Sequence, residues 1–594
     1  MDESLTIDGT ASDASRFAGR VGRLREHLKQ FVYARKAEVV CACLLLVMGG
    51  NLLAVISRKS ITNDEVVSIP AGYYHLAAGN FQISIDHPPV TKMYAALPLL
   101  FVQPNEPPIT VRPGEDSQQR TLRTQEEFWN ANATRFAAIS FWSRVPMITL
   151  TLALGLLIFV YARQLFGARA AVLSVFLFSL EPTVLAHGRT VLNDLPAALA
   201  YLLFFFVLHS YLKAPDWRHA IVLGLVSGLA VATKFSMVII APVLVLTALV
   251  TIWTAPRRGD ARARIGGRMI LAALAALLVI NAAYFFQGQP PEQLEFPWLA
   301  STFSPAHLGG VMTGVRALAK VVPSYVLSGI DFVLARNKYG QTASLLGAYS
   351  DTGWWYYFPL AFALKTTIPF LLISAAAILW SLWKLFAGRN KMFLALLVPF
   401  SIYFLVSLTS HINIGIRHFL PVFPFLFILG GAFLDWLLRQ RRAGHAAVIV
   451  VVLLAGWTVI EAVRAYPNHM SYMNELTWSH PRWYYLSDSN IEWGDDVPEL
   501  ANYLRARGET NVRAALLGGW ATLPRYGVGY VSMLVPPDTQ LPETRYVAIG
   551  ASFLNGSTVT INRPGQPRQD FFAEYRNRIP EAVFGNSIYL YREK

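Results

Sequence analysis

The stretch EVVCACLLLVMGGNLLAVISRKSITNDE, residues 38–65, decides the fold of this chain. Residues 38–57 are almost entirely apolar, and a helix of about 20 such residues spans the hydrocarbon core of a bilayer, which is about 30 Å thick. Asp64 and Glu65 follow at once, and a carboxylate is costly if it stays in hydrocarbon. The stretch therefore predicts a membrane-spanning helix that delivers an acidic pair to one membrane surface.

The composition extends this pattern over the whole chain. The 594 residues are 54% hydrophobic and only 15% charged, whereas about a quarter of the residues in soluble proteins are charged. Eleven apolar runs are long enough to cross a membrane, and they predict a polytopic α-helical membrane protein. These runs are 38–57, 145–162, 170–186, 195–212, 219–233, 236–253, 269–286, 357–383, 392–410, 417–437 and 445–464.

The distribution of basic residues sets the expected orientation. A shorter run, 90–102, contains a lysine and a proline, and it could be a twelfth span or a helix that lies at the interface. If the basic tail 1–37 is cytoplasmic and 90–102 does not span, the later basic clusters all fall on the cytoplasmic side. The exceptions are Arg58 and Lys59, which would snorkel or face anionic lipid. The later clusters contain Arg163, Arg169, Lys213, Arg218, Arg257, Arg258, Arg262, Arg264, Arg268, Lys384, Arg389, Lys391, Arg439, Arg441 and Arg442.

This topology divides the chain into a cytoplasmic tail, a transmembrane module at 38–465 and an extracytoplasmic part at 466–594. Residues 466–594 are polar and combine one helical pattern with three strand-like runs, which predicts a small α/β domain. Apolar residues at helical spacing with interleaved basic residues predict an interfacial helix at 307–336. The predicted outer loops are 58–144, 187–194, 287–356 and 411–416.

The net charge of +14 does not indicate nucleic acid binding. The basic residues lie between apolar runs and form no separate basic domain, as expected of cytoplasmic loops. Cys41 and Cys43 lie two residues apart on the first predicted helix and point to different faces. They therefore predict neither a disulfide nor a metal pair.

The acidic pair is the sharpest candidate for chemistry. One carboxylate can act as a general base that removes the proton from an attacking hydroxyl. The pair also fits an ordinary solvated helix start, with Thr62 or Asn63 as the cap. A second polar group, Asp86-His87-Pro88-Pro89, is a weaker candidate because a turn alone explains its prolines.

The predicted hairpin around 187–194 concentrates further polar residues, namely Glu181, His187, Arg189 and Asp194. Asp194 precedes Leu195-Pro196 and could simply cap the next helix. It is also where a second acid would meet Asp64 to hold a metal or to orient an acceptor. Both interpretations are open from these residues alone.

Two cations and an aromatic cluster complete the candidates. Lys234 separates two apolar runs, and Arg417 with His418 begins a later one, all on the predicted outer side. Two half-buried cations on one face suit an anionic ligand such as a phosphate, although each alone could snorkel. The aromatics Trp354, Trp355 and Tyr356 fit a membrane aromatic belt or a platform for a sugar or lipid head.

The order and membrane side of these motifs resemble the GT-C membrane glycosyltransferases. The Asp-Glu pair, the His-Pro-Pro turn and the hairpin aspartate are similar to the branch of protein O-mannosyltransferases and aminoarabinose transferases, which use polyprenyl-phosphate sugars. Further motifs resemble bacterial members of this branch, the phospholipid carrier-dependent glycosyltransferases. The other motifs that resemble this branch are ATKFS (232–236), GWWYYFPLAFALKT (353–366), GIRHFLPVFPF (415–425), YPNHMSYMNEL (466–476) and SDSNIEWGDDVPELANYL (487–504).

The resemblance implies a GT-C bundle in a bacterial inner membrane, with interfacial helices in the first outer loop. It implies inverting, single-displacement transfer of a sugar to a lipid, protein or glycan acceptor. Asp64 would be the base, Glu65 would help to bind the acceptor or position Asp64, and Asp194 would be the second acid. No cofactor is required by the resemblance, although Mg²⁺ or Mn²⁺ could bind at Asp64 and Asp194.

The resemblance also implies how the donor is held. Lys234 and Arg417, together with His418, would neutralise the departing lipid phosphate. Glu181, Glu492 and the long insertion 103–135 depart from the family pattern, which leaves the choice of sugar and acceptor open. The further substrate-binding candidates are His87, Arg189, Glu181, Trp354, Trp355 and Tyr356.

Two other classes of function compete with a transferase. A transporter or flippase of a lipid-linked sugar would typically show internal repeats and charges at mid-membrane. Here no repeat is visible and the charges gather at one face. A non-catalytic assembly protein would leave Asp64, Asp194, Lys234 and Arg417 unexplained, so the pattern favours the transferase.

Overall fold

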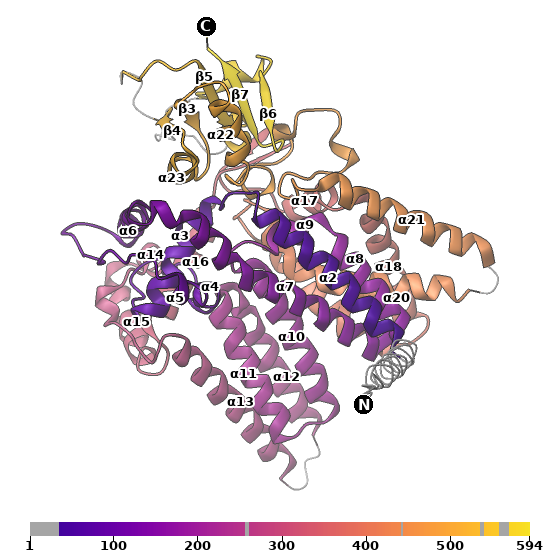
Figure 1. Cartoon of the computed structure of the whole chain (residues 1–594). Helices are drawn as coiled ribbons and strands as arrows, with labels where there is room; N and C mark the ends of the chain where they lie inside the picture. The colour runs from indigo at the N-terminus through magenta and orange to yellow at the C-terminus, as the bar shows by residue number, and fades with distance from the viewer. Residues whose placement is uncertain (1–34, 256–259, 441–443, 535–539, 557–569, 594) are drawn as a thin grey trace, which may run out of the picture.

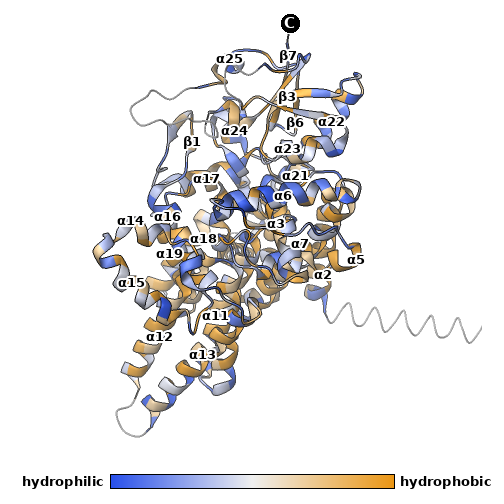
Figure 2. Ribbon diagram, turned by 90° about the vertical axis from the view of Figure 1, so that its left-hand side faces the viewer, coloured by the Kyte–Doolittle hydropathy of each residue, from blue (hydrophilic) through white to orange (hydrophobic). Residues whose placement is uncertain are grey.

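The computed structural model describes residues 35–255, 260–440, 444–534, 540–556 and 570–593, which form a helical bundle with a small α/β domain at one end (Figure 1). The predictions for the tail before residue 35 and for Arg257, Arg258, Arg441 and Arg442 lie outside these residues. Hydrophobic residues dominate the bundle, whereas hydrophilic ones gather around α6 and in the C-terminal domain (Figure 2).

Among the described residues, eight helices are long and apolar enough to cross a membrane, and three shorter apolar helices accompany them. Each of the eleven predicted runs overlaps one of these helices, so the predicted polytopic α-helical fold is confirmed. The long ones contain α2 (Lys36–Ile56), α7 (Phe136–Phe166), α10 (Asp194–Lys213), α12 (Ile240–Thr254), α13 (Ala261–Ala283), α18 (Ile368–Phe386), α20 (Phe423–Leu438) and α21 (Gly444–Ala465). The short ones contain α8 (Ala168–Leu180), α11 (Trp217–Thr233) and α19 (Leu394–Ser407).

Several predicted boundaries were wrong, in each case near a proline. The run 357–383 is two helices, α17 (Tyr357–Lys365) and α18, which has Pro369 in its first turn. The run 170–186 is likewise divided into α8 and α9 (Pro182–His187), and 307–336 into α15 (Pro305–Leu318) and α16 (Ser324–Tyr339). Proline lacks a backbone donor and favours the first turn of a helix, so it begins the second segment in such cases.

The run 90–102 does not form a spanning helix. It is divided by Pro98 into α4 (Val90–Ala96) and α5 (Leu99–Val102), each too short to cross a bilayer. The preceding helix α3 (Asn63–Ala77) begins with a capping box in which the Thr62 amide donates to Glu65 Oε2 at 2.8 Å. This cap fixes the position at which α3 starts, and hence the position of Asp64.

The insertion 103–135, which has no role in the family pattern, supports α3. It contains α6 (Ser117–Ala131), whose Phe128 and Trp129 are buried against the apolar face of α3. Trp129 Nε1 donates a hydrogen bond of 2.8 Å to the carbonyl of Val66. The insertion therefore braces the helix that carries the acidic pair.

Helix α20 lies in the middle of the bundle and packs against α8 and α18. Gly431 permits the contact with α8, because a Cβ atom there would lie 2.1 Å from Ser174 Oγ and 2.6 Å from the Ala170 carbonyl oxygen. The short helix η5 (Ile416–Val422) leads directly into α20 and contacts α10. The packing of α20 therefore fixes the segment that carries Arg417.

The C-terminal domain is a five-stranded mixed sheet with strand order β4-β3-β5-β7-β6, next to helix α22 (Val497–Arg505). Strand β3 pairs in parallel with β4 and β5, and β7 pairs antiparallel with β5 and β6. The predicted helix and three predicted strands are all present. The strands are β3 (Asn511–Ala515), β4 (Gly529–Ser532), β5 (Tyr546–Gly550), β6 (Ala582–Phe584) and β7 (Ile588–Arg592), and a separate hairpin pairs β1 (Ala343–Leu345) with β2 (Ala348–Ser350).

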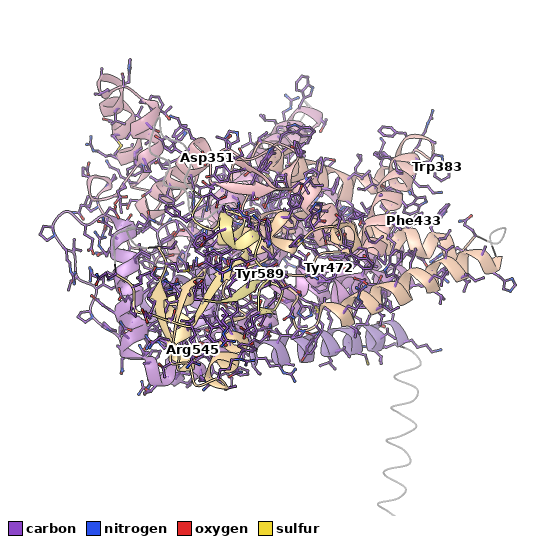
Figure 3. The ribbon with its side chains drawn as sticks, turned by 90° about the horizontal axis from the view of Figure 1, so that it is seen from above. Asp351, Trp383, Phe433, Tyr472, Arg545 and Tyr589 are labelled. Carbon is purple, nitrogen blue, oxygen red and sulfur yellow. The ribbon has the colours of Figure 1, made fainter. Side chains whose placement is uncertain are left out.

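This domain covers one end of the bundle. In the view from above, the strands around Arg545 and Tyr589 lie over the bundle, while Trp383 and Phe433 lie to one side (Figure 3). Lys59 is part of this contact and does not face lipid, so that prediction was wrong. It is buried in ion pairs with Asp496 and Glu499 of the C-terminal domain. Its neighbour Arg58 lies over the ring of Tyr466, 5.8 Å from the centroid.

Candidate active site

Four residues from distant parts of the sequence form one chain of alternating charges. Arg417 Nη1 donates to Asp64 Oδ2 at 2.8 Å and lies 3.6 Å from Asp194 Oδ2. Lys234 Nζ donates to the other oxygen of Asp194, Oδ1, at 2.5 Å. We call Asp64, Arg417, Asp194 and Lys234 the charged cluster. The sequence predicted all four as site residues on one membrane face, and the structure brings them together.

Each member of the charged cluster lies at or next to the end of a helix. Asp64 is in the first turn of α3, and Asp194 is the first residue of α10. Lys234 has an extended backbone and lies between α11 and η2 (Phe235–Ile239), where it separates two apolar runs. Arg417 lies in η5, before α20. Helix ends expose polar backbone groups, so four helix ends meeting here create a polar site within an apolar bundle.

Burial distinguishes Asp64 from the other three residues. The side chains of Arg417, Asp194 and Lys234 are 7%, 5% and 9% exposed, whereas that of Asp64 is 33% exposed. Buried charges require partners, and the alternation of acid and base supplies them. Asp64 is therefore the member of the charged cluster that an incoming molecule can reach from water.

Two histidines lie within electrostatic reach of the charged cluster. Both histidines are half-buried, and two of their ring nitrogens, His418 Nε2 and His87 Nδ1, are buried without a hydrogen-bond partner among the described residues. Burial lowers the pKa of His87, which favours its neutral form. Lys92, whose pKa burial lowers to about 8, fixes the His87 turn by donating to the His87 carbonyl at 3.0 Å.

Glu65 is buried away from the charged cluster. Arg144 Nε donates to Glu65 Oε1 at 3.1 Å, and the Val191 amide donates to the same oxygen at 2.9 Å. The side chains of Glu65 and Arg144 are both 0% exposed. Glu65 is therefore not placed to touch an acceptor, and the alternative that it positions Asp64 through the start of α3 stays a prediction.

We expect Glu65→Ala to destabilise the protein. Breaking a buried ion pair by removing one partner leaves an uncompensated charge, here that of Arg144, and typically costs about 3–5 kcal/mol. Thermal unfolding in detergent, followed by loss of monodisperse protein, measures this effect. The exposed glutamate Glu126 on α6 is the matched control. Equal unfolding temperatures for Glu65→Ala and Glu126→Ala would contradict a structural role for Glu65.

The other hairpin residues do not join the charged cluster. Arg189 is fully buried and donates to Asp495 Oδ2 at 2.8 Å. Glu181 is also buried and accepts a bond of 3.3 Å from Thr367 Oγ1. Glu181 Oε1 and Arg189 Nε and Nη1 have no hydrogen-bond partner among the described residues, so the substrate-binding role of these two residues stays a prediction.

The aromatic residues at the start of α17 have mixed positions. Trp355 and Tyr356 are 68% and 40% exposed and meet edge to face, with centroids 5.5 Å apart. The amide of Trp354 donates to Asn413 Oδ1 at 2.7 Å. Exposed aromatics at a membrane surface fit an aromatic belt as well as a sugar platform, so the substrate-binding role stays a prediction.

The sequence did not reveal the contribution of Trp493 and Asp488. The guanidinium of Arg417 lies over the ring of Trp493, with Cζ 4.2 Å from the centroid. Burial raises the pKa of Asp488 to about 6, while Arg417 acts to lower it and Asp64 to raise it. In the sequence, this segment contributes only to the motif at 487–504, in which Glu492 departs from the family pattern. One feature of the sequence pointed to such neighbours: the cations predicted in the transmembrane module need partners when they are buried.

The sequence departure at Glu492 gives a pH-dependent stability. Burial raises the pKa of Glu492 to about 8 from 4.5, so its carboxyl stays protonated in the folded chain over a range where the unfolded chain ionises it. Its contribution to stability is complete below pH 4.5 and is lost as the pH rises through about 8.

We therefore expect the unfolding temperature of the wild type to fall between about pH 5 and pH 8, and that of Glu492→Gln to fall less. Glutamine is neutral throughout and can still accept the 2.9 Å bond from the Leu517 amide. Thermal unfolding at several pH values tests this, with the exposed Glu574→Gln as control. An equal fall of the unfolding temperature with pH in the wild type and in Glu492→Gln would contradict the raised pKa of Glu492.

A divalent cation does not fit the charged cluster as it stands. No group of three or more His, Cys, Asp or Glu side chains is placed to hold a metal ion in the part of the chain that the structure describes. The two carboxylates predicted as ligands, Asp64 and Asp194, are already bonded to Arg417 and Lys234. We therefore derive no chemical step through a metal ion.

Comparisons with known proteins give one family model and several distant solved structures. Residues 135–284, about a quarter of the chain, match the family model of Dolichyl-phosphate-mannose-protein mannosyltransferase. This segment includes Asp194 and Lys234 of the charged cluster. A search among curated proteins finds no match.

Solved structures with similar architecture are more distant. ArnT from Cupriavidus metallidurans bound to undecaprenyl phosphate is 13% identical, with a TM-score of 0.45, over 93% of this chain and 97% of that one. Archaeal oligosaccharyltransferase AglB from Archaeoglobus fulgidus, in complex with an inhibitory peptide and a dolichol-phosphate, is 12% identical, with a TM-score of 0.42, over 88% of this chain and 71% of that one. The family model, over residues 135–284, confirms the resemblance to the protein O-mannosyltransferase branch of the GT-C glycosyltransferases.

Proposed function

We propose that this chain is a membrane glycosyltransferase that moves one sugar from a polyprenyl-phosphate donor to an acceptor hydroxyl. The observation that carries the proposal is the charged cluster, in which a half-exposed carboxylate lies beside two buried cations. Such a reaction needs a carboxylate as the base and cations that hold the leaving phosphate, and the charged cluster contains groups of both kinds. The matched family is named for transfer from a dolichyl-phosphate sugar, which supports a lipid phosphate as the leaving group.

The reaction is a single displacement. The acceptor oxygen attacks the anomeric carbon from the face opposite the phosphate and gives its proton to Asp64. The bond from the anomeric carbon to the phosphate oxygen breaks, and its electron pair leaves with the polyprenyl phosphate. Lys234 and Arg417 stabilise the negative charge that develops there. Attack from the opposite face inverts the configuration of the sugar.

Buried nitrogen atoms without partners support an anionic ligand. Arg417 Nε has no hydrogen-bond partner among the described residues, as is also true of His418 Nε2. Buried polar atoms are normally satisfied, and each exception asks for an explanation. The oxygens of a phosphate between these two residues would accept a hydrogen bond from Arg417 Nε, which carries a proton at all physiological pH values. Asp194 contacts both cations and holds them near each other.

The orientation follows from the charge distribution of the sequence. With the N-terminal tail in the cytoplasm, the charged cluster and the C-terminal domain lie on the extracytoplasmic side of a bacterial inner membrane. The donor is then lipid-linked because a soluble nucleotide sugar is not supplied on that side. The acceptor is a lipid, protein or glycan that presents a hydroxyl at the membrane surface.

A transfer assay tests the proposal. Purified protein in nanodiscs is mixed with polyprenyl-phosphate sugars of several kinds and with lipid, peptide and glycan acceptors. We expect one equivalent of polyprenyl phosphate to appear for each sugar transferred, with inverted configuration in the product. In proteoliposomes, movement of intact donor between the leaflets without any transfer would instead identify a flippase and contradict the proposal.

A further inference from the structure

The segment Ser487–Asp496 of the C-terminal part contacts both the start of α3, which carries Asp64, and η5, which carries Arg417. We call this segment the outer clamp. It precedes α22 and crosses the end of the bundle where α3 and η5 begin. Its residues are buried or half-buried, and Trp493 is only 1% exposed. The charged cluster therefore has the outer clamp as one of its walls.

The outer clamp holds the start of α3 through backbone hydrogen bonds. The amide of Asn63 donates to the Trp493 carbonyl at 2.8 Å, and the amide of Ser60 donates to the Asp495 carbonyl at 2.9 Å. Asn63 immediately precedes Asp64. Because these bonds use main-chain atoms, they fix the path of the chain up to the carboxylate that we propose as the base.

The same segment holds η5 on its other side. Ser489 Oγ donates to the Ile414 carbonyl at 2.8 Å, and the Ile416 amide donates to Asn490 Oδ1 at 2.9 Å. The ring of Trp493 lies under the guanidinium of Arg417 at 4.2 Å. One side chain thus contacts the cation, while the main chain of the same residue holds the segment that carries Asp64.

Ion pairs keep the outer clamp from shifting. Asp495 pairs with Arg189 at 2.8 Å, and Asp496 pairs with Lys59; the side chains of these four residues are at most 3% exposed. Removing any one partner would leave a buried charge without compensation. The position of Trp493 is therefore imposed by four charged groups of the surrounding structure.

We propose that Trp493 is a positioning residue of the transferase site, and that the outer clamp sets the distance between Asp64 and Arg417. This inference rests on the proposed function, because it assigns Trp493 a role in sugar transfer. Its test does not depend on transfer, because binding of a lipid phosphate can be measured separately. A flat aromatic face holds a planar guanidinium in one orientation, which leaves its Nη1 toward Asp64 and its Nε free for a ligand.

The test compares Trp493→Leu, Trp493→Phe and the control Trp478→Leu in the full-length protein. Trp478 also lies near an arginine, Arg464, at 5.5 Å, but it is 69% exposed and outside the charged cluster. The measured quantities are the affinity for undecaprenyl phosphate, kcat, and KM for the acceptor. Thermal unfolding shows which variants are folded.

We expect Trp493→Leu to weaken undecaprenyl phosphate binding and to lower kcat, each by about tenfold to thirtyfold, the scale of a desolvated cation–π contact. The KM for the acceptor should stay unchanged in Trp493→Leu. In Trp493→Phe, affinity and kcat should stay within about threefold of the wild type, because phenylalanine keeps an aromatic face. All values for Trp478→Leu should match the wild type. Equal values for Trp493→Leu and Trp478→Leu would overturn the proposal, and so would equal losses in Trp493→Leu and Trp493→Phe.

If Trp493→Leu does not fold, Ser489→Ala tests the proposal instead. It removes only the bond to the Ile414 carbonyl, and we expect about a threefold to tenfold loss of undecaprenyl phosphate affinity, the scale of one hydrogen bond. Wild-type affinity in Ser489→Ala would then overturn the proposal. A wild-type protein that binds undecaprenyl phosphate but transfers no sugar would refute the proposed function and leave this comparison intact.

Discussion

Asp64→Asn is expected to lower the rate of sugar transfer at least a hundredfold, the usual scale for loss of a general base. Asparagine keeps the shape of the side chain and can still accept the hydrogen bond from Arg417 Nη1, which is 2.8 Å long in the wild type. It cannot take a proton from the acceptor. The measurement is kcat for transfer with the donor and acceptor identified in the nanodisc assay.

The control for this variant is Glu126→Gln, an exposed carboxylate of the same outer loop. We expect it to turn over at the wild-type rate, and we expect both variants to unfold at temperatures close to that of the wild type. Undecaprenyl phosphate affinity should change little in Asp64→Asn, because the cations remain. Unchanged turnover in Asp64→Asn would remove this residue from the catalytic role.

Arg417→Gln is expected to lower kcat by about a hundredfold to a thousandfold, the usual effect of removing one donor that stabilises a developing anion. The Arg417 side chain is the only one in the charged cluster that contacts both Asp64 and Asp194. Its loss therefore also separates Asp64 from Asp194 and Lys234. Undecaprenyl phosphate affinity should fall together with kcat, in contrast to Asp64→Asn. Parallel measurements of both quantities check this difference.

Arg417→Lys distinguishes charge from geometry. Lysine keeps the positive charge but has neither the planar fork nor the five donors of arginine, so it cannot contact two carboxylates and lie flat on Trp493. We expect partial recovery, between the glutamine variant and the wild type. Full activity in Arg417→Gln would show that the phosphate is held elsewhere.

The membrane helices could be predicted because burial in lipid demands long apolar runs, and the small domain because its strands and helix have clear periodicity. Asp64, Asp194, Lys234 and Arg417 could also be predicted, since a charge at the end of an apolar run needs a reason to be there. Helix ends were less accurate. Apolar residues lie on both sides of Pro182 and Pro369, and only the tertiary structure shows whether the helix continues.

The partners of buried charges could not be predicted, because they come from distant segments. The sequence suggested that Glu65 binds the acceptor or positions Asp64, but its partner Arg144 lies in α7 and no local pattern links the two. Lys59 looked like a lipid-facing residue for the same reason, since its partner Asp496 belongs to the C-terminal domain. The cross-domain pairing that makes these residues structural is visible only after folding.

The most direct test of the central claim, that the charged cluster holds a lipid phosphate, is an electron cryomicroscopy structure of the full-length protein with undecaprenyl phosphate. The account predicts phosphate oxygens about 2.7–2.9 Å from Lys234 Nζ and from the Arg417 guanidinium, the distance of a charge-assisted hydrogen bond. It also predicts that Asp64 faces the side of the phosphate on which the sugar would lie. A phosphate bound at the opposite membrane surface, with Lys234 and Arg417 still paired only to Asp194 and Asp64, would contradict the account.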